Sequence, residues 1–123
     1  MSSHALCRGR VLVVDDEPRI ADLLVAMLEG LGHTAEKAVT REDAVRRAAS
    51  LRPDVVLLDA TLPGVVGTDL FDALKLAVPQ ARILVMTGDP VRADALLDAG
   101  ASGYLTKPFK IEALAERLKN VLP

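Results

Sequence analysis

The sequence predicts an α/β fold in which five strand-helix units form a parallel sheet with helices on both faces. Short apolar runs recur along the chain, and the segments between them carry apolar residues at helical spacing. Such alternation builds right-handed crossovers in a parallel sheet. The apolar runs are continuous rather than alternating, as strands buried on both faces require. We therefore expect a three-layer sandwich with the doubly wound strand order 2-1-3-4-5.

The first two units contain one strongly apolar strand and one polar strand. The first strand contains the apolar run Val11 to Val14. The second is polar, which is typical of a sheet edge, and the capping-box pattern from Thr40 to Asp43 predicts that the second helix begins near Thr40. The first helix has one apolar stripe, formed by Ile20, Leu23, Leu24, Met27, Leu28 and Leu31.

The last three units repeat the alternation. Their strands contain the apolar runs Val55 to Leu58, Ile83 to Met86 and Tyr104-Leu105. The last helix again has an apolar stripe, which consists of Ile111, Leu114, Ala115, Leu118 and Leu122. The complete expectation is strands near 10–15, 34–38, 54–58, 82–87 and 102–106, with helices near 18–31, 40–51, 68–77, 91–98 and 109–121.

Length and composition indicate one globular domain. The 123 residues are enough for a core and too few for two domains, so we expect a single domain over 1–123 with its core at about 10–121. Half of the residues are hydrophobic, but Phe71, Tyr104 and Phe109 are the only aromatic ones, which predicts an aliphatic core. The net charge is −2 with acids and bases interspersed, so direct nucleic-acid binding is not expected.

The sequence also lacks membrane and metal-binding cysteine or histidine patterns. No apolar run approaches the roughly 20 residues of a membrane-spanning helix, and residues 1–10 lack a signal-peptide core. We therefore expect a cytoplasmic protein. Cys7, His4 and His33 do not have the spacing of a metal site, and no chemical role is expected for them.

Polar side chains stand at the ends of four predicted strands. Asp15 and Asp16 follow the first strand, Asp59 the third, Thr87 the fourth and Lys107 the fifth. In a parallel sheet these ends share one edge, beside the crevice where such folds bind ligands. Three carboxylates repel one another unless a cation lies among them, and an oxygen-only site suits Mg²⁺, or Mn²⁺ in its place. An aspartate beside Mg²⁺ and a lysine can attack phosphorus and form an acyl phosphate.

Each of these residues also has an ordinary structural explanation. Asp16 with Pro18 can begin a helix, and Asp89-Pro90 can begin another. Asp59 can start a turn, Thr87 can simply end a strand, and Lys107 can be solvated. If no functional site is present, all of these structural explanations must be true at once. A functional site at the sheet edge is therefore the better interpretation.

In combination, these motifs identify a family. The chain resembles the receiver domain of bacterial two-component response regulators from about Val11 to Val121. The matching segments are Val13-Val14-Asp15-Asp16-Glu17-Pro18, Asp59-Ala60-Thr61-Leu62-Pro63 with Gly67, Met86-Thr87-Gly88, Ala99-Gly100-Ala101 and Tyr104-Leu105-Thr106-Lys107-Pro108-Phe109. The resemblance implies a flavodoxin-like (βα)₅ sandwich and a phosphorylation-dependent switch. Its partners would be a sensor histidine kinase or histidine phosphotransfer protein, and a downstream target or tethered output domain.

The resemblance also implies a role for each site residue. Asp59 would be the phosphoacceptor, and Thr87 and Lys107 would bind the phosphoryl oxygens. Mg²⁺ would be held by Asp16 directly, by Asp15 through water or hydrogen bonds, by Asp59, and by the backbone carbonyl of Thr61. Tyr104 would turn inward when Thr87 moves toward the phosphate. Thr61 and Asp89 would tune the phosphoryl lifetime, and the bond between Lys107 and Pro108 would be cis.

The sequence departs from the common family pattern in a few places. Leu62 replaces the usual Met, and Ser102-Gly103 lacks acids that pair across a dimer in winged-helix regulators. Only twelve residues separate Thr87 from Gly100, so the fourth helix should be short or begin late.

The sequence is also compatible with two other functions. One is a receiver-like interaction module that is not phosphorylated. The other is a small Mg²⁺-dependent phosphatase with an aspartyl-phosphate intermediate, although no cap insertion is evident. The switch itself would not be an enzyme for other substrates, because it promotes only its own phosphorylation and dephosphorylation.

Overall fold

Strands and helices alternate along the chain, as the sequence predicts. The computed structural model describes residues 9–60 and 69–122. The strands are β1 (Arg10–Val14), β2 (Thr34–Ala38), β3 (Val55–Asp59), β4 (Arg82–Thr87) and β5 (Gly103–Thr106). The helices are α1 (Pro18–Gly30), α2 (Arg41–Leu51), α3 (Asp69–Ala77), α4 (Pro90–Asp98) and α5 (Ile111–Val121).

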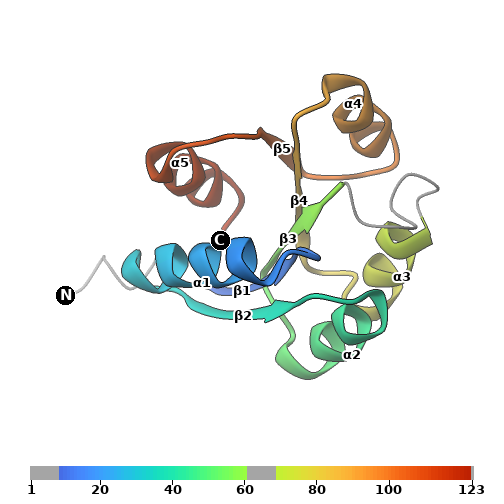
Figure 1. The fold of residues 1–123 in the computed structure, drawn as a ribbon. Helices are drawn as coiled ribbons and strands as arrows, with labels where there is room; N and C mark the ends of the chain where they lie inside the picture. The colour runs from blue at the N-terminus through green and yellow to red at the C-terminus, as the bar shows by residue number, and fades with distance from the viewer. Residues whose placement is uncertain (1–8, 61–68, 123) are drawn as a thin grey trace.

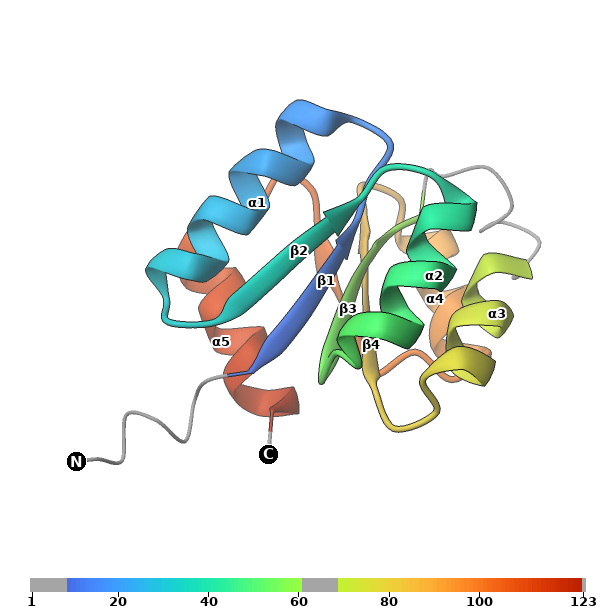
Figure 2. The ribbon, with the colours of Figure 1, turned by 90° about the horizontal axis from the view of Figure 1, so that it is seen from below.

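The five strands form one parallel sheet in the order β2-β1-β3-β4-β5, which confirms the predicted topology. Helices α1 and α5 cover one face, and α2, α3 and α4 cover the other (Figures 1 and 2). β1 pairs with both β2 and β3, with Val11 opposite Ala35 and Val55. The polar strand β2 lies at one edge, as predicted. The central strands β1 and β3 are fully buried except for Arg10.

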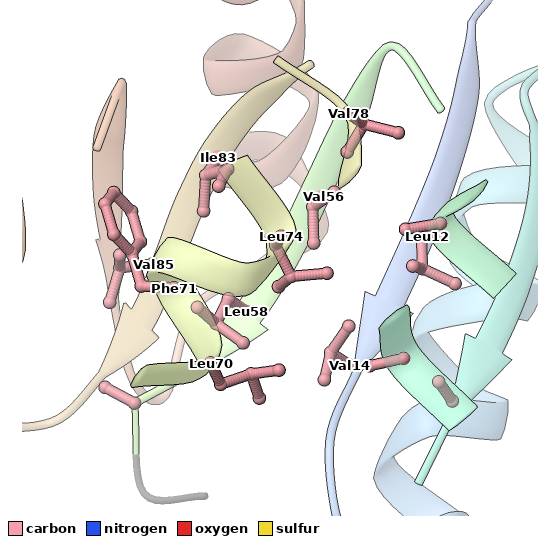
Figure 3. Close-up of a cluster of buried hydrophobic side chains, with 14 of the residues drawn as sticks. Leu12, Val14, Val56, Leu58, Leu70, Phe71, Leu74, Val78, Ile83 and Val85 are labelled. Carbon is pink, nitrogen blue, oxygen red and sulfur yellow. The ribbon is translucent and has the colours of Figure 1, made fainter. Parts of the chain in front are cut away.

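Alternate residues of the central strands supply two separate cores. Val11, Val13, Val55 and Leu57 pack toward α1 and α5. Leu12, Val14, Val56 and Leu58 pack on the opposite face, where Leu70, Phe71 and Leu74 from α3 meet them (Figure 3). Phe71 is fully buried, whereas Tyr104 is only partly buried against this second core. The predominance of Val, Leu, Ile and Ala agrees with the expected aliphatic interior.

Helix α1 contacts the sheet through a narrower stripe than the sequence pattern predicts. Its buried residues are Ala21, Leu24 and Leu28. Leu23 is 56% exposed and Ile20 is 37% exposed, although both belong to the predicted stripe. The row of α1 that faces the sheet includes the small Ala21. Ile20 and Leu23 therefore lie at the edge of the contact between α1 and the sheet.

The ends of two helices follow local sequence signals. The backbone N–H of Asp43 donates to Thr40 Oγ1 at 3.1 Å, which confirms the predicted start of α2. In a complete capping box the Asp43 carboxylate would accept a hydrogen bond from the backbone N–H of Thr40. Here it accepts from Arg46 and Arg47, so only one of the two capping-box hydrogen bonds forms. Helix α4 is short, with nine residues, as expected, although it begins directly after Asp89. Its C-terminal end leads into Gly100, which has φ +114°.

Replacing Gly100 with alanine is expected to destabilise the protein by about 1–2 kcal/mol, because an L side chain is strained at positive φ. The added Cβ would lie 2.5 Å from Lys75 Nζ, but a flexible lysine end can move away, so the backbone term dominates. Urea unfolding measures the change. Gly30→Ala is the control: nothing lies within 4 Å of the new Cβ, and a small gain in stability is expected. Equal effects at the two positions would contradict this explanation.

Candidate functional site

The predicted acidic residues meet at the carboxyl edge of the sheet. Asp15 and Asp16 follow β1, and Asp59 is the last residue of the neighbouring strand β3. One carboxylate oxygen from each of the three lies within 4.8 Å of the others. Asp15 and Asp59 are buried, whereas Asp16 is exposed. The cluster therefore combines two buried carboxylates with one that is exposed to solvent.

Lys107 brings a positive charge to the same place from the end of β5. Its Nζ lies 3.4 Å from Asp59 Oδ2 and 3.5 Å from Asp15 Oδ2. The backbone N–H of Lys107 donates to the carbonyl of Thr87 at 2.8 Å, which continues the pairing of β4 with β5. The peptide bond between Lys107 and Pro108 is cis, as the family resemblance implies. The ammonium thus contacts both buried carboxylates.

The charge on Asp15 is poorly compensated. Burial raises the pKa of its carboxyl, and the nearby charge of Asp59 raises it further, while a hydrogen bond from the Glu17 backbone and the charge of Lys107 oppose the shift. Asp15 Oδ2 is buried and has no hydrogen-bond partner among the described residues. A buried oxygen of this kind, beside two more carboxylates, fits a hard divalent cation such as Mg²⁺.

Asp15→Asn is expected to stabilise the metal-free protein at pH 7 by on the order of 1 kcal/mol. Because the folded-state pKa of Asp15 is raised, its proton favours the folded state, and that contribution is lost as the pH rises through the folded pKa. The gain should therefore disappear below the unfolded pKa, near pH 3. Urea unfolding at both pH values measures it. A destabilised variant at pH 7 without metal would contradict the expectation.

Thr87 and Asp89 are joined in one turn at the end of β4. Thr87 is buried, and its Oγ1 accepts from the backbone N–H of Asp89 at 3.0 Å. Asp89 Oδ1 in turn accepts from the N–H of Val91 at 2.9 Å, so Asp89 caps α4. Tyr104 lies on β5, opposite Val85, with the Arg117 guanidinium 6.0 Å from its ring centre.

The structure places most of the predicted site residues, and it adds one that sequence reasoning missed. Thr61 lies outside the described residues. Arg92 on α4 donates from Nη1 to the carbonyl of Ala60, directly after Asp59, at 3.4 Å. Its position three residues after the helix cap Asp89 indicates a contact with that side chain, but no sequence pattern indicates the contact with Ala60. His33 has a structural role, since its buried Nδ1 accepts from the N–H of Gly9 at 3.0 Å.

Comparison with known proteins agrees with this fold. The family model of the response regulator receiver domain matches residues 11–119. The solved chemotaxis protein CheY4 of Vibrio cholerae superimposes with a TM-score of 0.84 at 29% identity, covering 94% of this chain and 99% of that one. A receiver domain protein from Clostridium thermocellum gives 0.83 at 26% identity, covering 92% and 93%. The chain therefore belongs to the response regulator receiver domain family.

Curated relatives at higher identity are longer proteins. The probable transcriptional regulatory protein TcrX of Mycobacterium tuberculosis is 38% identical over 91% of this chain and 49% of its own length. The DNA-binding response regulator MtrA of Mycolicibacterium smegmatis is 37% identical over 91% and 50%. The chain thus spans about half the length of these relatives. Within 9–60 and 69–122, no helix has the length and apolar character needed to span a membrane.

Proposed function

We propose that this chain is a signalling switch that accepts a phosphoryl group on Asp59 from a sensor histidine kinase or a histidine phosphotransfer protein. The observation that carries the proposal is the position of the Asp59 carboxylate, which lies beside the carboxylates of Asp15 and Asp16 and 3.4 Å from Lys107 Nζ. In the transfer, Asp59 forms a P–O bond as the P–N bond of the phosphohistidine breaks and the imidazole leaves. Lys107 would neutralise charge on a phosphoryl oxygen.

The proposed metal ligands follow from the acid cluster. Asp16 and Asp59 would contact Mg²⁺, with Asp15 beside them, and the family resemblance adds the backbone carbonyl of Thr61. The ion, when bound, would supply positive charge against the phosphoryl oxygens. The exposed position of Asp16 suits a ligand that a hydrated ion reaches first. Asp15 Oδ2 has no hydrogen-bond partner among the described residues, and the ion would add its charge to the contact with Lys107 Nζ at 3.5 Å.

The proposed response to phosphorylation begins at Thr87. The added charge on Asp59 would attract the Thr87 hydroxyl away from its turn with Asp89, and Tyr104 on the adjacent strand would follow inward. Tyr104 is only partly buried, so it has room to change its packing. Such a pair forms a two-state element that a local charge can bias.

The proposed partners are a phosphodonor and a downstream protein target or tethered output domain. The relatives TcrX and MtrA are named as transcriptional or DNA-binding regulators, but the residues of this chain carry net charge −2 with both signs interspersed. We therefore propose no direct nucleic-acid contact by this chain. A cytoplasmic location is part of the proposal, because response regulators are typically cytoplasmic.

Incubation with acetyl phosphate and Mg²⁺ separates the three candidate functions. The switch predicts one phosphoryl group per chain, detected by intact-mass measurement, and slow release of phosphate. An interaction module without phosphorylation predicts no added mass. A phosphatase predicts many turnovers of acetyl phosphate per chain. Omission of Mg²⁺ is the control and should suppress the added mass.

A further inference from the structure

Arg92 connects helix α4 to the end of the strand that carries Asp59. Its Nη1 donates to the carbonyl oxygen of Ala60 at 3.4 Å, and its Nε lies 3.9 Å from Asp89 Oδ2. The N–H of Ala60 donates to the carbonyl of Met86 at 2.9 Å, so this part of β3 is paired with β4. The guanidinium therefore lies over the β3–β4 side of the carboxyl edge.

Both contacts of Arg92 are weak and easily exchanged. A hydrogen bond of 3.4 Å lies beyond the usual N–H···O range. The ion pair with Asp89 is also long, and its two side chains are 42% and 53% exposed, so its contribution to stability is small. Within residues 9–60 and 69–122, these are the two polar contacts of Arg92, and breaking them costs little.

Phosphorylation of Asp59 would change what lies within reach of this guanidinium. A phosphoryl group adds about −1.5 to −2 charges at pH 7 and three strong acceptor oxygens. These appear on the residue next to Ala60, whose carbonyl Arg92 already contacts. A guanidinium binds phosphate oxygens through hydrogen bonds that are often bidentate and in which both partners are charged, whereas the Ala60 carbonyl offers one neutral acceptor.

We infer that Arg92 is a phosphoryl-binding residue, whose guanidinium moves from the Ala60 carbonyl to an oxygen of the phosphoryl group on Asp59. The inference rests on the proposed function. Lys107 reaches the group from β5, and Arg92 reaches it from the α4 side. The new contact exists only in the phosphorylated protein, so it favours the conformation in which it forms. Because Arg92 is part of α4, the contact draws this short helix toward β3, the strand that carries Asp59.

The test uses beryllium trifluoride, which mimics a phosphoryl group on a carboxylate, in the presence of Mg²⁺. Arg92→Gln is expected to weaken its apparent affinity about fivefold, and Arg92→Lys should restore part of the loss. Arg82→Gln removes the same charge at the opposite end of β4 and should bind like the wild type. The apo amide spectrum of each variant checks that it is folded.

A second measurement reports the contact itself. The Nε–H resonance of Arg92 should shift when wild-type protein is saturated with beryllium trifluoride. Equal affinity of Arg92→Gln and wild type, or a loss that Arg92→Lys does not restore at all, overturns the inference, as does an unchanged Nε–H resonance. Failure of the wild type to bind the mimic, in contrast, counts against the proposed function.

Discussion

Asp16→Ala is expected to weaken Mg²⁺ binding about 100-fold, while Asp89→Ala leaves it within about twofold. The two residues are both exposed acids near the carboxyl edge. Asp16 belongs to the cluster whose carboxylate oxygens lie within 4.8 Å of one another. Asp89 instead bonds the backbone of Val91 as the cap of α4. Only the first is placed to contact a cation held by Asp15 and Asp59.

For the free energy of unfolding, the larger loss is expected from Asp89→Ala and not from Asp16→Ala. Asp89→Ala removes a helix cap and is expected to cost about 1 kcal/mol. Asp16→Ala removes one of three crowded carboxylates, so the metal-free protein should be no less stable than wild type. Metal titration by calorimetry and urea unfolding without metal measure the two quantities. Equal losses of Mg²⁺ affinity in the two variants would contradict the assignment of Asp16.

Lys107→Ala is expected to leave phosphorylation of Asp59 detectable but to uncouple it from β5 and α5. Lys107 Nζ lies 3.4 Å from Asp59 Oδ2, and Lys107 follows β5, which carries Tyr104. Its ammonium therefore ties the new charge to the position of that strand. A ligand shifts an equilibrium only by the difference in its contacts between two states, and this variant loses part of that difference.

Amide spectra before and after phosphorylation measure the coupling. The shifts at Tyr104 and Phe109 should fall to about half of the wild-type change or less. Lys110→Ala, an exposed neighbour outside the acid cluster, is a suitable control and should retain the full shifts. If Lys107→Ala also retains them in full, Lys107 does not couple the site to β5.

The parallel sheet could be predicted because its signals are local. Continuous apolar runs mark buried strands, and polar residues directly after them mark one edge. These signals predict that Asp15, Asp59 and Lys107 lie together, and the structure places Lys107 Nζ within 3.5 Å of both carboxylates. The edge position of β2 followed in the same way from its polar sequence.

Features that depend on packing between elements could not be predicted in this way. The periodicity of α1 included Leu23, but the contact with the sheet runs through Ala21, Leu24 and Leu28. Similarly, the contact of Arg92 with the Ala60 carbonyl joins residues 32 positions apart. Its long side chain crosses between two elements whose spacing only the folded structure sets.

Mapping the phosphoryl group tests the central proposal most directly. After incubation with acetyl phosphate and Mg²⁺, peptide mass spectrometry should place a single modification on Asp59, and Asp59→Asn should carry none. Asp59 is the acid that ends the central strand β3, beside the acid pair and 3.4 Å from Lys107 Nζ. A modification on Asp15 or Asp16, or full modification of Asp59→Asn, would contradict the proposed role of Asp59.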